Sequence, residues 1–247
     1  MQTGEAFRDG YVDVGGVAIH YVASTPDPTR GLPVLAVPGF GEAADEWEPF
    51  LARLAPRPAA AVSVRGRGRS DAPERGYRWE DHVDDVDAVV DAMGWDELAV
   101  VGFSRGSSYA LGFALRHPRR VRALVIGDYE ARHVGLGPSF VEASLKRRWN
   151  GRTMLERMPE HAIRGMQEES VEIPLWDRLG ELTCPVLLIR PERRGILTDE
   201  SVARWGAAVA ALEVVTLAGT GHNMWTDDPE GFAALARDFV ARVDPQP

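Results

Sequence analysis

The sequence contains a single cysteine, Cys184, among 247 residues. One thiol excludes an intrachain disulfide and any metal site built from several cysteines, so the chain fits a reducing compartment. Positive charge is also scarce: 28 Lys and Arg stand against 37 Asp and Glu, which gives a formal net charge of -9. A nucleic-acid partner is not expected, because phosphate binding needs a surplus of basic side chains gathered on one face.

Long apolar runs are missing as well. No uninterrupted stretch approaches the roughly 20 apolar residues that cross a membrane. Residues 1–10 have neither the basic start nor the apolar segment of a secretion signal. We therefore expect a cytoplasmic protein without membrane insertion. Nothing in the residues implies a metal or an organic cofactor, and nothing in them indicates the oligomeric state.

What the chain does contain is enough apolar material, 45% of its residues, for one sizeable core in one domain. Short apolar runs typical of strands alternate with segments whose apolar residues recur at helical spacing. This alternation predicts an α/β fold with a mainly parallel sheet and helices on both faces, binding ligands at the carboxyl ends of the strands. The predicted strands are 12–22 at an edge, 33–37, 59–64, 98–102, 121–127, 185–189 and 212–217, and the predicted helices are 46–54, 80–93, 104–117 and 229–243.

One interval, 129–183, interrupts the alternation because it contains helical stretches but no convincing strand. An insertion that follows the strand 121–127 is expected to form a lid over the carboxyl edge of the sheet. We therefore assign residues 1–128 and 184–244 to the core, 129–183 to the lid and 245–247 to a frayed tail.

Residues 102–106 read Gly-Phe-Ser-Arg-Gly, a G-x-S-x-G pattern centred on Ser104. The pattern follows one predicted strand and opens one predicted helix, which is the context that a nucleophile elbow requires. The glycines two positions before and after the serine allow a sharp, strained turn, and the helix N-terminus points backbone N–H groups at a developing oxyanion. The sequence therefore predicts that Ser104 is a nucleophile.

A serine hydroxyl needs a positioned base, and one histidine fits that position. His222 lies between the last predicted strand and the terminal helix, in the sequence Gly-Thr-Gly-His-Asn. We predict that it is the base. Structural or solvated roles are expected for the other histidines, which are His20, His82, His117, His133 and His161.

Together these motifs resemble the α/β-hydrolase superfamily over almost the whole chain. Residues 38–41, Pro-Gly-Phe-Gly, resemble its oxyanion loop, and residues 65–70, Arg-Gly-Arg-Gly-Arg-Ser, look like its R-G-x-G-x-S turn. The resemblance implies the α/β-hydrolase fold with a small helical lid inserted after the sixth strand. It also implies an oxyanion hole made by the backbone N–H groups of Phe40 and Arg105.

The acid that orients the histidine is not where most members of this superfamily carry it. The loop after the strand 185–189 begins with Arg190, and an arginine cannot hold the imidazole tautomer or stabilise its cation. Asp128 follows the strand 121–127 directly and resembles the alternative acid position of haloalkane dehalogenases and some esterases. We expect Asp128 to be the acid, and Glu192 and other acids such as Asp199 stay open.

The predicted lid is rich in large apolar residues, so we expect a largely apolar pocket with Trp149 and Trp176 as substrate contacts. Arg193 and Arg194 belong to a local basic cluster in an acidic chain. They are either solvated or attract a substrate that carries a carboxylate.

These residues predict a serine hydrolase that cleaves a carboxylic ester, thioester or lactone of a small, mostly apolar molecule through an acyl-enzyme. This small-molecule substrate is the binding partner that we expect. Two other functions stay open. Similar enzymes hydrolyse a carbon–carbon bond in diketone-like substrates with the same residue types, and a hydrolase scaffold can bind ligands without turnover. The aspartate nucleophile of the similar dehalogenases and epoxide hydrolases is excluded by Ser104.

Overall fold

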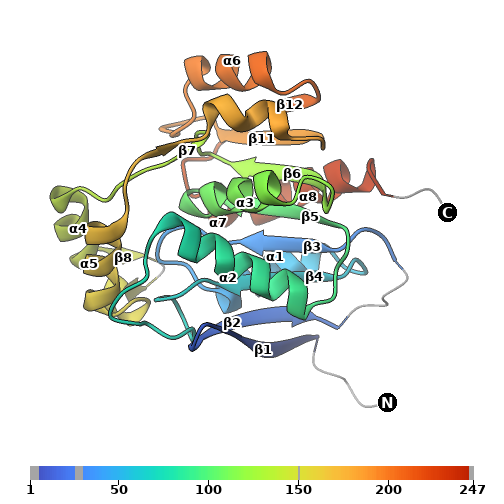
Figure 1. The fold of residues 1–247 in the computed structure, drawn as a ribbon. Coiled ribbons are helices and arrows are strands. Elements are labelled where there is room, and N and C mark those ends of the chain that lie inside the picture. The colour runs from blue at the N-terminus through green and yellow to red at the C-terminus, as the bar shows by residue number, and fades with distance from the viewer. Residues whose placement is uncertain (1–5, 26–29, 150, 245–247) are drawn as a thin grey trace.

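A twisted sheet of eight strands forms the centre of the molecule, in the order β1-β2-β4-β3-β5-β6-β11-β12 (Figure 1). The computed structural model describes residues 6–25, 30–149 and 151–244, so the predicted tail 245–247 lies outside the described residues. The strands are β1 Phe7–Val14, β2 Val17–Ser24, β3 Val34–Val37, β4 Ala59–Ser63, β5 Leu98–Phe103, β6 Val121–Gly127, β11 Val186–Pro191 and β12 Leu212–Leu217.

The sheet is mainly parallel, as the alternation of strands and helices predicts. Strands β4, β3, β5, β6, β11 and β12 pair in parallel, whereas β1 pairs with β2 and β2 with β4 in the antiparallel sense. All residues of β3, β4 and β5 are buried, because helices cover both faces of these central strands. Their continuous apolar runs are the sequence signature of that burial.

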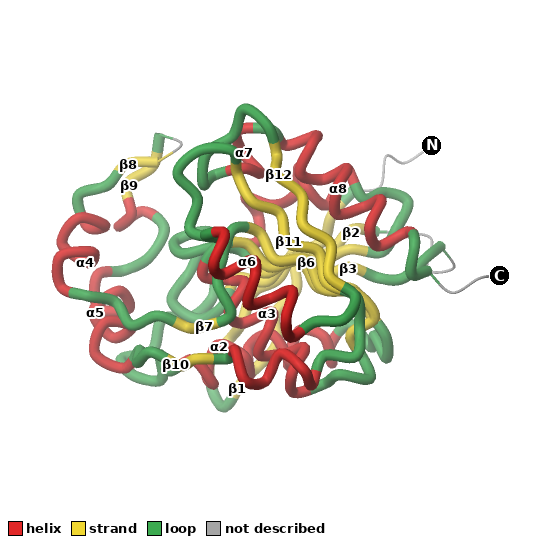
Figure 2. The backbone as a smooth tube through the Cα atoms, turned by 90° about the horizontal axis from the view of Figure 1, so that it is seen from above, coloured by secondary structure: helices red, strands yellow, loops and turns green. Residues whose placement is uncertain are grey.

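Helices cover the sheet in two layers, which Figure 2 shows from above. Helices α2, α3 and α6 pack on one face, and η1, α1, α7 and α8 pack on the other, so that each face has its own apolar cluster. The bounds are η1 Ala44–Trp47, α1 Glu48–Arg53, α2 Trp79–Ala92, α3 Arg105–Arg116, α6 Asp199–Ala208, α7 Met224–Asp227 and α8 Pro229–Ala241. The predicted α/β architecture with helices on both faces is confirmed.

The predicted edge strand 12–22 is wrong, because the segment belongs to two antiparallel strands, β1 and β2. Gly15 and Gly16 form the turn between them, with φ of 62° and 90°. Two adjacent residues in the left-handed region give the tight turn whose twist matches that of a hairpin. Apolar residues continue to alternate on either side of this turn, which hides it in the hydrophobic pattern.

Residues 138–149 and 151–169 lie beside the carboxyl ends of β5 and β6, at the left of Figure 1, whereas residues 176–181 pack on α6 and α3. The insertion 129–183 contains helices, as the sequence indicates, together with two pairs of two-residue strands, β7 with β10 and β8 with β9, which the sequence does not indicate. The elements are β7 Arg132–His133, α4 Pro138–Leu145, β8 Arg148–Trp149, β9 Arg152–Thr153, η2 Met154–Glu156, α5 Glu160–Glu169, β10 Ile173–Pro174 and η3 Trp176–Glu181. A third apolar cluster, which includes Val141, Met154 and Ile163, lies in this insertion.

Candidate active site

Ser104 stands at a sharp turn between the end of β5 and the start of α3. Its φ of 50° lies in the left-handed region that side chains rarely adopt, so the turn holds local strain. Gly106 allows α3 to begin against the β3 strand, because a Cβ there would lie 2.2 Å from the carbonyl oxygens of Val37 and Pro38. The glycine of the G-x-S-x-G pattern is therefore a packing requirement of this turn.

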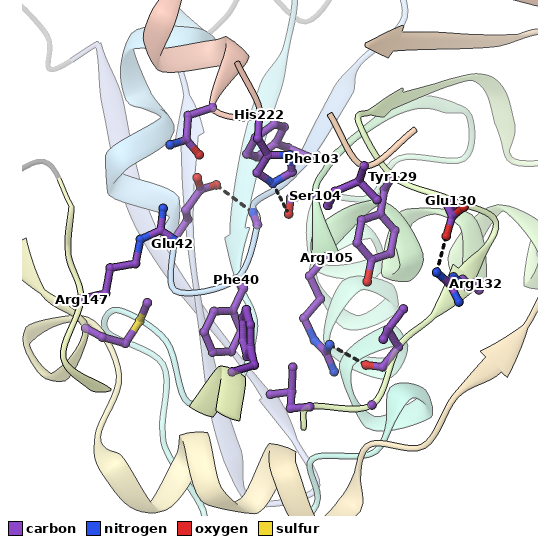
Figure 3. A pocket seen from close by; sticks show the side chains of 18 residues that line it. Phe40, Glu42, Phe103, Ser104, Arg105, Tyr129, Glu130, Arg132, Arg147 and His222 are labelled. Atoms are coloured by element: carbon purple, nitrogen blue, oxygen red, sulfur yellow. Dashed lines mark hydrogen bonds and ion pairs between the residues drawn. The ribbon is translucent and has the colours of Figure 1, made fainter. Parts of the chain in front are cut away.

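The imidazole of His222 links the serine to a carboxylate. Its Nε2 lies 2.9 Å from the Oγ of Ser104 (Figure 3). Its Nδ1 lies 2.6 Å from Oδ2 of Asp128. The ring stacks on Phe103, with centroids 5.3 Å apart, which fixes its plane. Three side chains that lie on separate loops thus meet in one hydrogen-bonded row.

Asp128 is fully buried and is held by donors from the loop after β11. The backbone N–H groups of Ile196 and Leu197 donate to its carboxylate at 2.9 Å, and its own N–H donates to the carbonyl of Ile189 at 2.8 Å. These fixed backbone donors hold the carboxylate in one orientation. The side chain therefore meets the geometric needs of an acid that orients His222.

The other acids weighed for this position point elsewhere. Oε2 of Glu192 accepts a hydrogen bond from the N–H of Gly219 at 2.8 Å, on the exposed surface. Asp199 lies at the start of α6, where its side chain is 92% exposed and pairs with Arg190. Neither carboxylate contacts His222.

The loop between β3 and η1 lies directly beside Ser104. A Cβ on Gly39 would come within 3.2 Å of the Cβ of Ser104. In the described part of the chain, the backbone N–H groups of Phe40 and Arg105 have no hydrogen-bond acceptor. The N–H of Arg105 also belongs to the first residue of α3, where the helix dipole favours negative charge. Both groups are thus free to bind an oxyanion.

Glu42 is a buried carboxyl group in this loop that sequence reasoning did not single out. It accepts hydrogen bonds from the N–H of Gly39 at 2.8 Å and from the indoles of Trp47 and Trp225 at 3.1 and 3.0 Å. Burial raises the pKa of the carboxyl from 4.5 to about 7, even though the three donors favour the ionised form. Glu42 joins the loop beside Ser104 to α7, which follows His222.

This shifted pKa makes a testable contribution to stability. Between pH 4.5 and about 7 the unfolded chain releases the Glu42 proton and the folded protein keeps it. The free energy of unfolding therefore falls as pH rises through this window, by about 3 kcal/mol at most. In urea titrations, we expect Glu42→Gln to lack this decline, so that its stability relative to the wild type rises with pH. The exposed Glu200→Gln should give a constant difference, and parallel curves for Glu42→Gln would contradict the assignment.

A cavity of about 510 Å³ opens above Ser104 and His222. Most of its wall is apolar, and the rings of Phe40 and Phe140 meet edge to face at 5.3 Å across the boundary between core and insertion. The insertion supplies half of the lining. The lining residues are Gly39, Phe40, Glu42, Phe103, Ser104, Arg105, Tyr129, Glu130, Arg132, Val134, Gly135, Leu136, Phe140, Arg147, Met154, Ile196, His222 and Asn223.

Three of the substrate contacts expected from the sequence, Trp176, Arg193 and Arg194, are not in this wall. Trp176 packs on Trp205, with Arg204 over its ring at 4.0 Å, on the outer face of the sheet. Arg193 donates to the carbonyl of Gly219, and Arg194 is exposed to solvent. The side chain of Trp149 lies outside the described part of the structure.

Three arginines that the sequence analysis did not assign to substrate binding, Arg105, Arg132 and Arg147, line the cavity instead. No local pattern marks them, because their side chains reach the pocket from an elbow, a short strand and a turn. The family resemblance implied a site role for Arg105, but only for its backbone N–H in the oxyanion hole and not for its side chain.

No group of three or more His, Cys, Asp or Glu side chains in the described ranges could hold a metal ion. Among the helices that the structure describes, none combines the length and apolar character needed to cross a bilayer.

Comparison with known proteins shows which family the chain belongs to. Residues 33–179 match the family model described as alpha/beta hydrolase fold. The chain is 24% identical to 2-(acetamidomethylene)succinate hydrolase of Mesorhizobium japonicum, over 93% of this chain and 94% of that protein. It is also 24% identical to N-formylmaleamate deformylase of Pseudomonas putida, over 94% and 96% of the two chains.

Solved structures show the same fold. The enol-lactonase from Burkholderia xenovorans superposes with a TM-score of 0.78 at 18% identity, over 94% of this chain and all of that one. The matched segment 33–179 spans more than half of the chain and includes both Ser104 and Asp128. The chain belongs to the alpha/beta hydrolase fold family and is a hydrolase of that family.

Proposed function

We propose that the protein is a serine hydrolase that cleaves a carboxylic ester, thioester or lactone through an acyl-enzyme. The observation that carries this proposal is the row of hydrogen bonds from Ser104 through His222 to Asp128, at 2.9 and 2.6 Å, at the base of a mostly apolar cavity. A base that touches the nucleophile and an acid that orients the base form the arrangement that acyl transfer by serine requires.

The chemistry follows from this arrangement. His222 accepts the proton of Ser104 as Oγ attacks the acyl carbon, and Asp128 stabilises the resulting imidazolium. The N–H groups of Phe40 and Arg105 bind the oxyanion of the tetrahedral intermediate. His222 then donates its proton to the leaving oxygen or sulfur. Water, activated by the same histidine, hydrolyses the acyl-enzyme and restores Ser104.

Two comparisons widen the range of acyl groups worth testing. The relatives from Mesorhizobium japonicum and Pseudomonas putida have names that refer to an acetamido and an N-formyl group, and the structural neighbour is an enol-lactonase. An amide differs from an ester in its leaving group, whereas attack on the carbonyl carbon is shared.

The proposal is tested by labelling with a fluorophosphonate, which reacts with an activated serine, followed by turnover assays. The assay panel contains p-nitrophenyl esters, thioesters, lactones and N-formyl amides. We expect stoichiometric labelling at Ser104 and hydrolysis of at least one ester. A protein that binds these ligands without being labelled and without turnover would be a receptor on a hydrolase scaffold, which would overturn the proposal.

A further inference from the structure

The charged side chains that line the cavity have a net positive charge, whereas the protein as a whole has a net negative charge. The chain has a net charge of -9, yet three arginines and two glutamates line the pocket. One of these arginines is neutralised locally, because Arg132 pairs with Glu130 at 2.5 Å (Figure 3). It also pairs with Glu172 at 3.1 Å. Two pocket cations, Arg105 and Arg147, have no carboxylate partner among the described residues.

The side chain of Arg105 is buried, although all of its hydrogen-bond partners are uncharged. Its side chain is held by the Tyr109 hydroxyl at 3.0 Å, the Val134 carbonyl at 2.8 Å, the Ser170 hydroxyl at 2.7 Å and the His133 ring at 2.9 Å. Burying a guanidinium without an acid costs several kcal/mol. These dipoles hold the side chain in place, but they leave its positive charge uncompensated at the floor of the pocket.

A second buried guanidinium lies behind the first. Arg67 donates to the Gly39 carbonyl and to the Tyr109 hydroxyl. Among the described residues, no carboxylate forms a hydrogen bond or ion pair with this buried side chain. Burial and the two guanidiniums together lower the pKa of His133 to about 2, so this imidazole stays neutral. The guanidinium of Arg105 therefore lines the pocket, and a second guanidinium and a neutral histidine are buried behind it.

Arg147 presents its charge from the opposite wall. Its backbone is fixed, since its N–H donates to Ser144 and its carbonyl accepts from Met154, at 3.0 and 3.1 Å. Its guanidinium has no hydrogen bond or ion pair within the described residues, and Figure 3 shows the side chain extending along the pocket wall. Arg147 is therefore an exposed residue with a fixed backbone, and its free, planar donor group lies at the wall of the cavity.

Glu42, the acidic residue that lines the same part of the cavity, does not pair with Arg147. Both carboxyl oxygens of Glu42 are turned onto the N–H of Gly39 and the indoles of Trp47 and Trp225. A planar guanidinium with free N–H groups binds a carboxylate through two parallel hydrogen bonds. A positive field inside low-dielectric walls also attracts an anion before contact.

We propose that the acyl group of the substrate carries a carboxylate, which pairs with Arg147 while the scissile carbonyl lies at Ser104. This inference rests on the proposed serine hydrolase function and specifies its substrate class. The apolar wall between these two residues, with Phe40, Phe140 and Met154, holds a short hydrocarbon segment that separates the two carbonyl groups. The buried guanidiniums of Arg105 and Arg67 add attraction without taking part in the reaction.

A matched pair of esters tests the inference. Mono-p-nitrophenyl glutarate ends its acyl chain in a carboxylate, and p-nitrophenyl pentanoate ends the same length of chain in a methyl group. We expect kcat/KM for the anionic ester to exceed that for the neutral one by at least about tenfold at low salt, and the ratio to fall as ionic strength rises. Equal values for the two esters would overturn the inference.

The variant Arg147→Gln isolates the contact. It should lower kcat/KM for the glutarate ester by about 10- to 100-fold, mainly through KM, and leave the pentanoate ester within about twofold. Arg147→Lys should restore part of the loss. Arg194→Gln, which removes an exposed cation outside the cavity, is the control and should leave both esters unchanged. A loss that is equal for both esters would contradict the proposal.

A binding measurement separates this inference from the proposed function. Titration calorimetry of Ser104→Ala with monomethyl glutarate and with methyl pentanoate needs no turnover, and the anionic monomethyl glutarate should bind at least about tenfold more tightly than the neutral ester. Adding Arg147→Gln should abolish that preference. Failure of fluorophosphonate labelling would count against the serine hydrolase, whereas monomethyl glutarate that binds no better than methyl pentanoate would overturn the carboxylate site.

Discussion

Replacing Ser104 by alanine is expected to lower kcat for ester hydrolysis by about 10⁶-fold and to abolish fluorophosphonate labelling. The substitution removes the one oxygen that lies 2.9 Å from His222. Alanine keeps the Cβ at the strained turn, so the cost of the φ of 50° is the same in both proteins. The melting temperature should therefore change by only a few degrees while turnover disappears.

A matched control lies one turn further along the same helix. The hydroxyl of Ser107 is buried and has no hydrogen-bond partner in the described part of the chain. Ser107→Ala should therefore retain labelling and turnover within about twofold. If Ser104→Ala kept more than a hundredth of the wild-type kcat, or if labelling persisted in it, the nucleophile would have to be another residue.

Asp128→Asn is expected to lower kcat by about 10⁴-fold with the fold retained. An amide in this place turns an N–H toward the imidazole or toward the donors of Ile196 and Leu197. An N–H toward the imidazole disfavours the tautomer that accepts the Ser104 proton, whereas an N–H toward Ile196 and Leu197 sets a donor against their backbone donors. In both arrangements the imidazolium loses its counter-charge. The same clash should lower the free energy of unfolding by about 1–3 kcal/mol.

The comparison variant is Glu192→Gln, which lies in the loop where many members of the superfamily carry the acid. Its carboxylate accepts one hydrogen bond from Gly219 at the surface, so kcat should stay within about threefold of the wild type. Single-turnover kinetics of both variants separate acylation from deacylation. Intact turnover in Asp128→Asn together with loss in Glu192→Gln would move the acid to Glu192.

The parts of this fold that could be predicted are those encoded locally. The buried strands are continuous apolar runs, and the strand, G-x-S-x-G and helix around Ser104 lie within one short segment. The hairpin of β1 and β2 was missed because alternation continues through Gly15 and Gly16, so that a sharp turn leaves no break in the apolar pattern.

Site residues that depend on tertiary contacts were harder to predict. Asp128 was preferred over Glu192 from its place after a strand, and the geometry with His222 supports that choice as the proposed role. Arg147 has no sequence signal, because its importance comes from a lack of partners that only the folded chain reveals. Trp176 was chosen for its size, yet the core beside Trp205 binds a large aromatic ring as readily as a pocket does.

The way Asp128 is held has a consequence for how freely the chain can vary. The loop after β11 orients this carboxylate through the main-chain N–H groups of Ile196 and Leu197, which every residue except proline possesses. Residues 192 and 193 can therefore diverge in evolution, or be randomised in a directed library, without loss of the acid. Position 194 is more restricted, because its φ of 53° lies in the left-handed region that β-branched residues disfavour. Gly195 is restricted as well, because a Cβ there would lie 2.8 Å from Oδ1 of Asp128.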